Sequence, residues 1–169
     1  MKTMYALKPL SHEGIGGALA KAEHYRHLNE PAEAESICRD ILEIEPENQR
    51  ALVCLILSLS DQLAEDRGAF SNASKLLQRL ANAYDRTYYA GILWERRSKA
   101  RYHEGGHDVH HTVHEWVQKA LSLFEEAERM RPAGNDDALL RWNTCVRFLQ
   151  RHPDIAPRPA EEPAAILSE

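Results

Sequence analysis

A chain of 169 residues with 43% hydrophobic and 28% charged side chains has an ordinary globular composition and is long enough for one domain with a sizeable core. Its formal net charge of −5, without a run of Lys and Arg, argues against nucleic-acid binding, since phosphates require clustered basic side chains. No stretch of about 18 apolar residues occurs and residues 1–12 lack the apolar core of a signal peptide, so we expect a cytoplasmic protein without membrane spans.

Turn and capping signals predict four helices in the first half of the chain, after an irregular lead over residues 1–10. Pro31 suits the first position of a helix, and Pro46 ends one because the residue before proline avoids the helical conformation. The segment 49–64 is apolar almost all round, which indicates a helix covered on most sides. The predicted helices cover about residues 11–28, 31–45, 49–64 and 71–83.

Three longer helices are predicted in the second half. Gly105-Gly106 separates the first two of them, and Asn135, followed by two aspartates, is a good N-cap for the last. Beyond Pro153 the chain is rich in Pro, Ala and Glu, so we expect a disordered tail over residues 152–169. The predicted helices cover about residues 86–102, 108–130 and 135–151.

Two segments share an apolar spacing of 4, 3 and 5 residues that ends in proline. They are Ala34, Cys38, Ile41, Pro46 and Ala120, Phe124, Ala127, Pro132. Ahead of the first segment, Ala22 and Tyr25 stand at a small and an aromatic position. This pattern resembles the tetratricopeptide repeat (TPR) family, in which a small residue lets two helices approach and an aromatic fills the adjoining hollow. A generic helical hairpin is the alternative.

The resemblance implies an all-α fold, in which antiparallel helix pairs stack as a short TPR-like right-handed solenoid of about seven helices with a C-terminal capping helix. The second repeat is degenerate, because Asp85 stands where the closing proline is expected, and the third is stretched around Gly105-Gly106. The implied domain covers residues 11–151, with repeats at about 15–48, 49–84 and 85–132 and a cap at 135–151.

In this family the first helix of each repeat lines a concave face, which implies a peptide groove. Family members that clamp a C-terminal carboxylate use Lys and Asn where Leu19 and Glu23 stand, so we do not expect that specificity. The implied groove combines apolar and aromatic residues with a few charged ones, which suits an apolar or amphipathic partner segment. Tyr88 and Tyr89 could instead pack in the core. The implied groove residues are Leu19, Glu23, Arg26, Val53, Leu57, Ser60, Tyr88, Tyr89, Ile92 and Arg96.

The resemblance implies a non-catalytic scaffold or adaptor whose partner is a protein, a peptide or a second copy of the chain. We expect no cofactor, since no glycine-rich phosphate loop and no Ser or Cys with a His-Asp frame occurs. Cys38, Cys54 and Cys145 each fall within an apolar helical pattern, which indicates buried free thiols. The apolar residues 164–167 of the tail could dock into the groove of the same chain or of a neighbour.

Five of the nine histidines fall between positions 103 and 114. His110 and His114 are four residues apart, a spacing that lets two imidazoles bind one zinc ion, and His103 or His107 could add a ligand. The alternative function is therefore a metal-binding protein or a metal-dependent hydrolase. The glutamate of an HExxH motif is missing, so exposed histidines at a hairpin tip are the stronger interpretation, and a pH-sensitive patch is a third.

Overall fold

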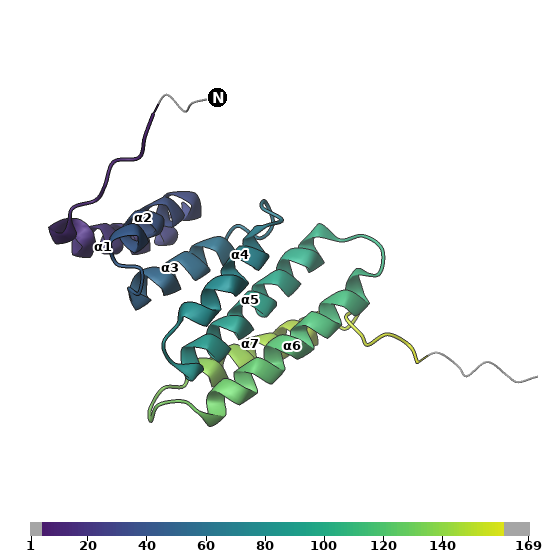
Figure 1. The fold of residues 1–169 in the computed structure, drawn as a ribbon. Helices are drawn as coiled ribbons and strands as arrows, with labels where there is room; N and C mark the ends of the chain where they lie inside the picture. The colour runs from purple at the N-terminus through teal and green to yellow at the C-terminus, as the bar shows by residue number, and fades with distance from the viewer. Residues whose placement is uncertain (1–4, 161–169) are drawn as a thin grey trace, which may run out of the picture.

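The computed structural model describes residues 5–160, and these residues form seven α-helices and no β-strand (Figure 1). The all-α prediction is confirmed. Short 3-10 turns at His12–Gly14 and Leu77–Arg79 precede α1 and follow α4. The helices are α1 (Ile15–His27), α2 (Pro31–Ile44), α3 (Gln49–Ser60), α4 (Ala69–Leu76), α5 (Ala83–Glu104), α6 (Val109–Arg129) and α7 (Asp137–Arg151).

Helices that follow one another in the chain pack together, and so do alternate helices. The consecutive contacts join α1 to α2, α2 to α3, α3 to α4, α4 to α5, α5 to α6 and α6 to α7. The alternate contacts join α1 to α3, α3 to α5 and α5 to α7. Figure 1 shows α1 and α2 at one end of the molecule and α6 and α7 at the other, with α3 to α5 between them.

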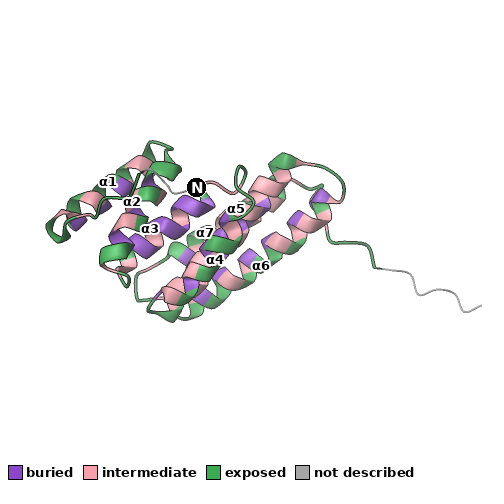
Figure 2. Cartoon of the chain, turned by 45° about the horizontal axis from the view of Figure 1, so that its top comes forward, coloured by how far each residue is buried: buried purple, intermediate pink, exposed green. Residues whose placement is uncertain are grey.

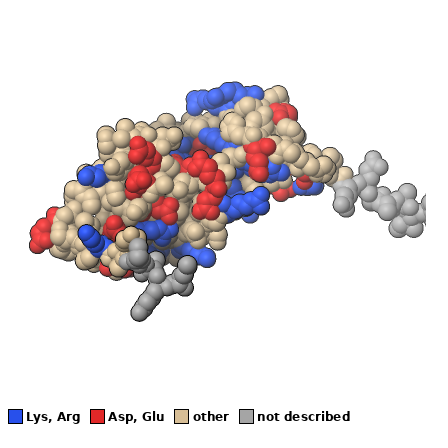
Figure 3. Space-filling model, turned by 90° about the horizontal axis from the view of Figure 1, so that it is seen from above, with Lys and Arg blue, Asp and Glu red and all other residues tan. Residues whose placement is uncertain are grey.

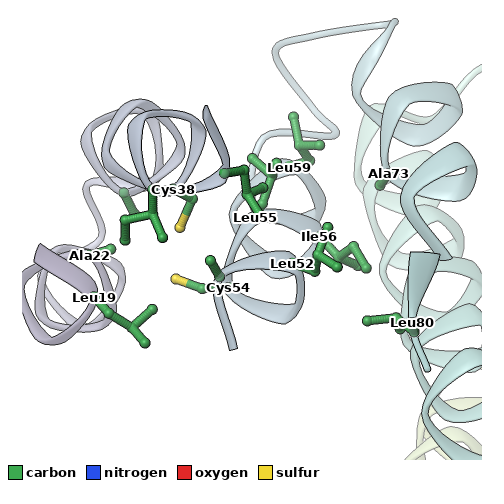
Figure 4. Packing of buried hydrophobic residues seen from close by; sticks show 14 of the residues in the cluster. Leu19, Ala22, Cys38, Leu52, Cys54, Leu55, Ile56, Leu59, Ala73 and Leu80 are labelled. Carbon is green, nitrogen blue, oxygen red and sulfur yellow. The ribbon is translucent and has the colours of Figure 1, made fainter. Parts of the chain in front are cut away.

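The first hydrophobic core lies between α1, α2, α3, α4 and the side of α5 that carries Leu93, and α3 is its centre (Figure 4). Eight of the twelve residues of α3 are buried, because neighbours cover this helix on several sides. Figure 2 shows the buried residues concentrated on α3 and on the facing stripes of the helices around it. An apolar sequence therefore produces a stable helix here, and each fully buried leucine contributes about 1.5–3 kcal/mol to folding.

The second core lies between α5, α6 and α7, and only one stripe of α6 faces it. The buried residues of that stripe recur with the helical period from Val109 to Ala127. Gly91 of α5 packs so closely that a Cβ atom added to it would lie 2.6 Å from Cε1 of Phe124. A glycine is required at this position because any side chain would displace the Phe124 ring.

Several helix boundaries differ from the sequence prediction, most of all the end of the fourth helix. The fourth helix ends at Leu76 with a 3-10 turn, well before residue 83, because Leu80 is already extended and Asn82 starts the next helix. The side-chain oxygen of Asn82 accepts a hydrogen bond from the backbone N–H of Asp85 at 2.7 Å. Asn82, and not Asp85, is therefore the N-cap of α5.

The segment after α7 was expected to be disordered, but residues 152–158 lie against α5 and α6. Ile155 is only 7% exposed and belongs to the second core. His152 Nδ1 lies 2.9 Å from the hydroxyl of Tyr102, and Arg158 Nη2 lies 2.7 Å from Asp108 Oδ2. Burial of one apolar side chain anchors a segment whose composition predicts disorder. Residues 161–169, with the proposed docking segment 164–167, lie outside the described residues.

Among residues 5–160, no helix combines the length and the apolar character that a membrane crossing needs. The expected cytoplasmic location stays a prediction.

Candidate functional site

Three of the predicted groove residues are packed inside the molecule. Leu19 is 5% exposed and Ile92 is 1% exposed, because the helical period places each on the inward stripe of its helix. Ser60 is buried and donates its hydroxyl to the carbonyl of Leu57. These three side chains are therefore not available to a partner. The half-buried remainder consists of Glu23, Arg26, Val53, Leu57, Tyr88, Tyr89 and Arg96.

One carboxylate joins the three helices that carry the predicted groove. Oδ2 of Asp61, directly after α3, accepts a hydrogen bond at 2.8 Å from Nε of Arg26 on α1 and also lies 2.8 Å from Nη2 of that guanidinium. Its other oxygen accepts from Nη1 of Arg96 on α5. Burial lowers the pKa of Arg96, and the negative charge of Asp61 acts in the opposite direction. Arg26 and Arg96, predicted from sequence, are thus brought together by a residue that the prediction missed. Arg96 also donates a hydrogen bond to the hydroxyl of Ser60, the third predicted residue of this group.

Asp61 could have been found from helical spacing. Val53, Leu57 and Asp61 follow one another at intervals of four residues, so they share one face of the α3 segment. The repeat pattern places the last groove position of this helix at Ser60, one residue before Asp61, so it did not include Asp61. Arg26 and Arg96 are each 35 residues away from Asp61 in the chain, so helical spacing does not predict their contacts with it.

A second charged group, centred on Glu95, lies where α5 meets α7. Glu95 is 2% exposed, and its Oε1 lies 2.5 Å from Lys99 Nζ and 3.5 Å from Arg141 Nη1. Its Oε2 has no hydrogen-bond partner among the described residues. Together with the Asp61 group, four cationic side chains surround two carboxylates. This region therefore has an excess of positive charge in a chain whose net charge is −5.

Tyr88 and Tyr89 contact the core and remain partly exposed, so their assignment to the groove stays a prediction. Their rings meet edge to face with centroids 5.0 Å apart, and Tyr88 also lies 6.0 Å from Phe124. Tyr84 extends the row by stacking on Tyr88 at 5.7 Å. Burial raises the pKa of Tyr89 to about 12, so its hydroxyl stays neutral at physiological pH. Part of the ring surface of this row remains exposed.

Aromatic and basic side chains also meet outside the predicted groove. The guanidinium of Arg97 lies 4.0 Å from the ring centre of Phe70 and 4.2 Å from that of Trp116. Lys119 Nζ lies 4.3 Å from the ring centre of Trp94. Such cation–π contacts hold α4, α5 and α6 together at their outer edges. Figure 3 shows Lys and Arg side chains next to Asp and Glu over the face that it draws, so neither sign dominates there.

The two ends of the helix array each carry a hollow. One of about 480 Å³ lies between α1 and α2 and is lined mainly by small and apolar residues, including Ala18 and Ile37. The other, about 350 Å³, lies between α6 and α7 beside Trp142 and Glu125. Neither involves the residues predicted to line the groove.

The histidine cluster contacts the C-terminal segment. His110 Nδ1 lies 2.8 Å from Asp154 Oδ2, and His111 Nδ1 lies 3.0 Å from the carbonyl oxygen of Ala156. Within residues 5–160, no group of three or more His, Cys, Asp or Glu side chains is placed to hold a metal ion. The four proposed ligands, His103, His107, His110 and His114, therefore do not converge on one point, and metal binding stays a prediction.

Comparison of the chain with models of protein families, with curated proteins and with solved structures finds no match. The resemblance to tetratricopeptide repeats therefore depends on the residue spacings alone.

Proposed function

We propose that this protein is a TPR-like scaffold or adaptor, which binds an amphipathic polypeptide segment across α1, α3 and α5. The helices would form antiparallel pairs stacked as a right-handed solenoid. The contacts between alternate helices support this arrangement, because stacked pairs bring the first helix of each pair against the first helix of the next. The proposed binding surface is the one formed by those first helices.

The observation that carries the proposal is the position of Asp61. A single carboxylate contacts Arg26 of α1 and Arg96 of α5 from the end of α3. These helices therefore present side chains to a common surface. Leu57 lies one helical turn before Asp61 and is partly exposed beside it. Apolar and charged groups are thus available next to one another on a surface that is already ordered.

The chemistry of this surface favours a partner with one apolar and one acidic face. Leu57 and Tyr89 would bury apolar partner side chains, which supplies most of the affinity. Arg26, Arg96 and Arg141 would attract carboxylates, which sets the register and accelerates association. Because the cations are already paired in part with Asp61 and Glu95, acidic partner groups would compete with these internal carboxylates.

The test is selection of a displayed library of random peptides on the immobilised full-length protein. We expect recovered peptides to combine Leu or aromatic residues with Asp or Glu. The variant Leu57→Asp together with Tyr89→Ala should weaken their binding at least about tenfold, because it removes apolar contact area and adds a repelling charge. Leu140→Asp makes the same chemical change at a residue of α7 that is 59% exposed and serves as the control.

Circular dichroism of each variant shows whether its helices remain intact. Peptides that bind the groove variant and the wild-type protein equally would overturn the groove assignment. Loss of binding in Leu140→Asp alone would place the partner on the outer side of α7.

A further inference from the structure

Two cysteine side chains meet at the centre of the first core. Cys38 lies on α2 and Cys54 on α3, and both helices contribute to the same cluster of buried residues. Figure 4 shows the two sulfur atoms directed toward each other across the interface between these helices. Each of the two thiols is the largest single influence on the pKa of the other, as expected for neighbouring sulfurs. A contact of this kind places two sulfurs from different helices where one covalent bond could join them.

The two thiols differ in chemical character. The interaction with Cys54 is the main cause that raises the pKa of Cys38, and the interaction with Cys38 is the main cause that lowers the pKa of Cys54. The positive charge of Arg26 also lowers the pKa of Cys54, whereas burial acts against it. Cys54 is 4% exposed and Cys38 is 0% exposed. Cys54 is therefore the residue that favours the thiolate and the slightly more exposed of the two.

We propose that Cys38 and Cys54 form an oxidisable dithiol, which a hydroperoxide converts into a disulfide between α2 and α3. The site would act as a redox-dependent covalent link within the first core. It does not depend on the peptide-binding function proposed above.

The reaction balances in two steps. The Cys54 sulfur attacks one peroxide oxygen and the O–O bond breaks, which leaves Cys54 as a sulfenic acid and releases water or an alcohol after the leaving oxygen takes a proton. The Cys38 sulfur then attacks the Cys54 sulfur, the S–O bond breaks, and the leaving hydroxide becomes water with the proton of Cys38. Two thiols lose two electrons in total, and one peroxide accepts them.

Cys145 provides an internal control. It is also buried, but it belongs to the second core, away from the other two cysteines of the chain. Burial is the main cause that raises its pKa, to about 12, so very little thiolate forms. We therefore expect Cys145 to remain a thiol under conditions that link Cys38 to Cys54.

The test is peptide mapping of the folded, reduced, full-length protein after treatment with hydrogen peroxide and alkylation in denaturant. We expect one linked peptide that contains Cys38 and Cys54, an alkylated Cys145, and complete reversal by dithiothreitol. The linked protein should melt at a higher temperature than the reduced protein, by about 5 °C or more, since the bond closes a loop in the unfolded chain.

Variants separate the two steps. Cys38→Ala should stop at the Cys54 sulfenic acid, which dimedone traps, whereas Cys54→Ala should leave Cys38 free for alkylation. Cys145→Ala should behave like the wild-type protein. The proposal is overturned if the wild-type map shows free or irreversibly oxidised Cys38 and Cys54 without a link, or if Cys145 pairs as readily as they do. Because the wild-type map decides this, a variant that loses its helical signal does not affect the result.

Discussion

The helices α1–α4 and the helices α5–α7 build their cores in different ways. In the first region, eight to fourteen residues make each helix, and α3 is surrounded by apolar neighbours. In the second region the helices run to 22 residues, and α6 buries a single stripe. The first core depends on one central helix, whereas the second depends on close approach between two long ones. This difference predicts where a substitution costs most.

Shortening a buried side chain of α3 should have the largest effect on the free energy of unfolding. Leu52 is completely buried at the centre of the first core, so Leu52→Ala removes apolar contacts on several sides at once. We expect a loss of about 2–5 kcal/mol in the free energy of unfolding, measured by chemical denaturation. Leu140→Ala makes the same change at an exposed residue and should lie within about 0.5 kcal/mol of wild type. Equal effects would contradict the central role of α3.

The close approach in the second region should be broken by a single methyl group. Gly91→Ala would place a Cβ atom against the Phe124 ring, so we expect a loss of about 1–3 kcal/mol through overpacking. Gly16→Ala on α1 is the matched control, because no atom lies within 4 Å of an added Cβ there. Alanine favours the helix at such a site, so its unfolding free energy should not fall. A neutral Gly91→Ala would show that α5 and α6 can separate freely.

The smallest effect should come from the segment that follows α7. Asp154→Ala removes the acceptor that His110 and Tyr102 contact, and both side chains of the His110–Asp154 pair are partly exposed. We expect a loss below about 1 kcal/mol in global stability. Limited proteolysis should nevertheless cut near residues 152–158 faster than in the wild-type protein. Glu47→Ala, which removes an exposed carboxylate near the other end, should leave that cleavage unchanged.

Most helices could be predicted from the sequence because prolines and apolar spacing mark helix ends and buried stripes locally. Pro31 begins α2 and Pro46 follows its end, and the spacing from Val109 to Ala127 marks the buried stripe of α6. The fourth helix was predicted too long, since its apolar residues continue to Leu80 while the backbone turns before it. Local periodicity does not distinguish a helix from an extended residue that buries the same side chain.

The candidate surface could be predicted only in part. Repeat spacing identified Arg26 and Arg96, but it missed Asp61, Glu95 and Arg141, whose partners lie on other helices. The histidines were visible as a cluster, yet their contacts with Asp154 and Ala156 span more than forty residues. Contacts of this kind depend on which helices meet, which no pattern within one helix encodes.

By itself the sequence determined that this protein is helical, where most of its helices begin, and which stripe of α6 faces inward, because backbone propensity and apolar periodicity are local properties. The tertiary structure alone decided which charges share a surface, which cysteines touch, and how the segment after α7 is held. The physical reason is that charge pairing, thiol contact and burial of Ile155 depend on distances between atoms far apart in the chain.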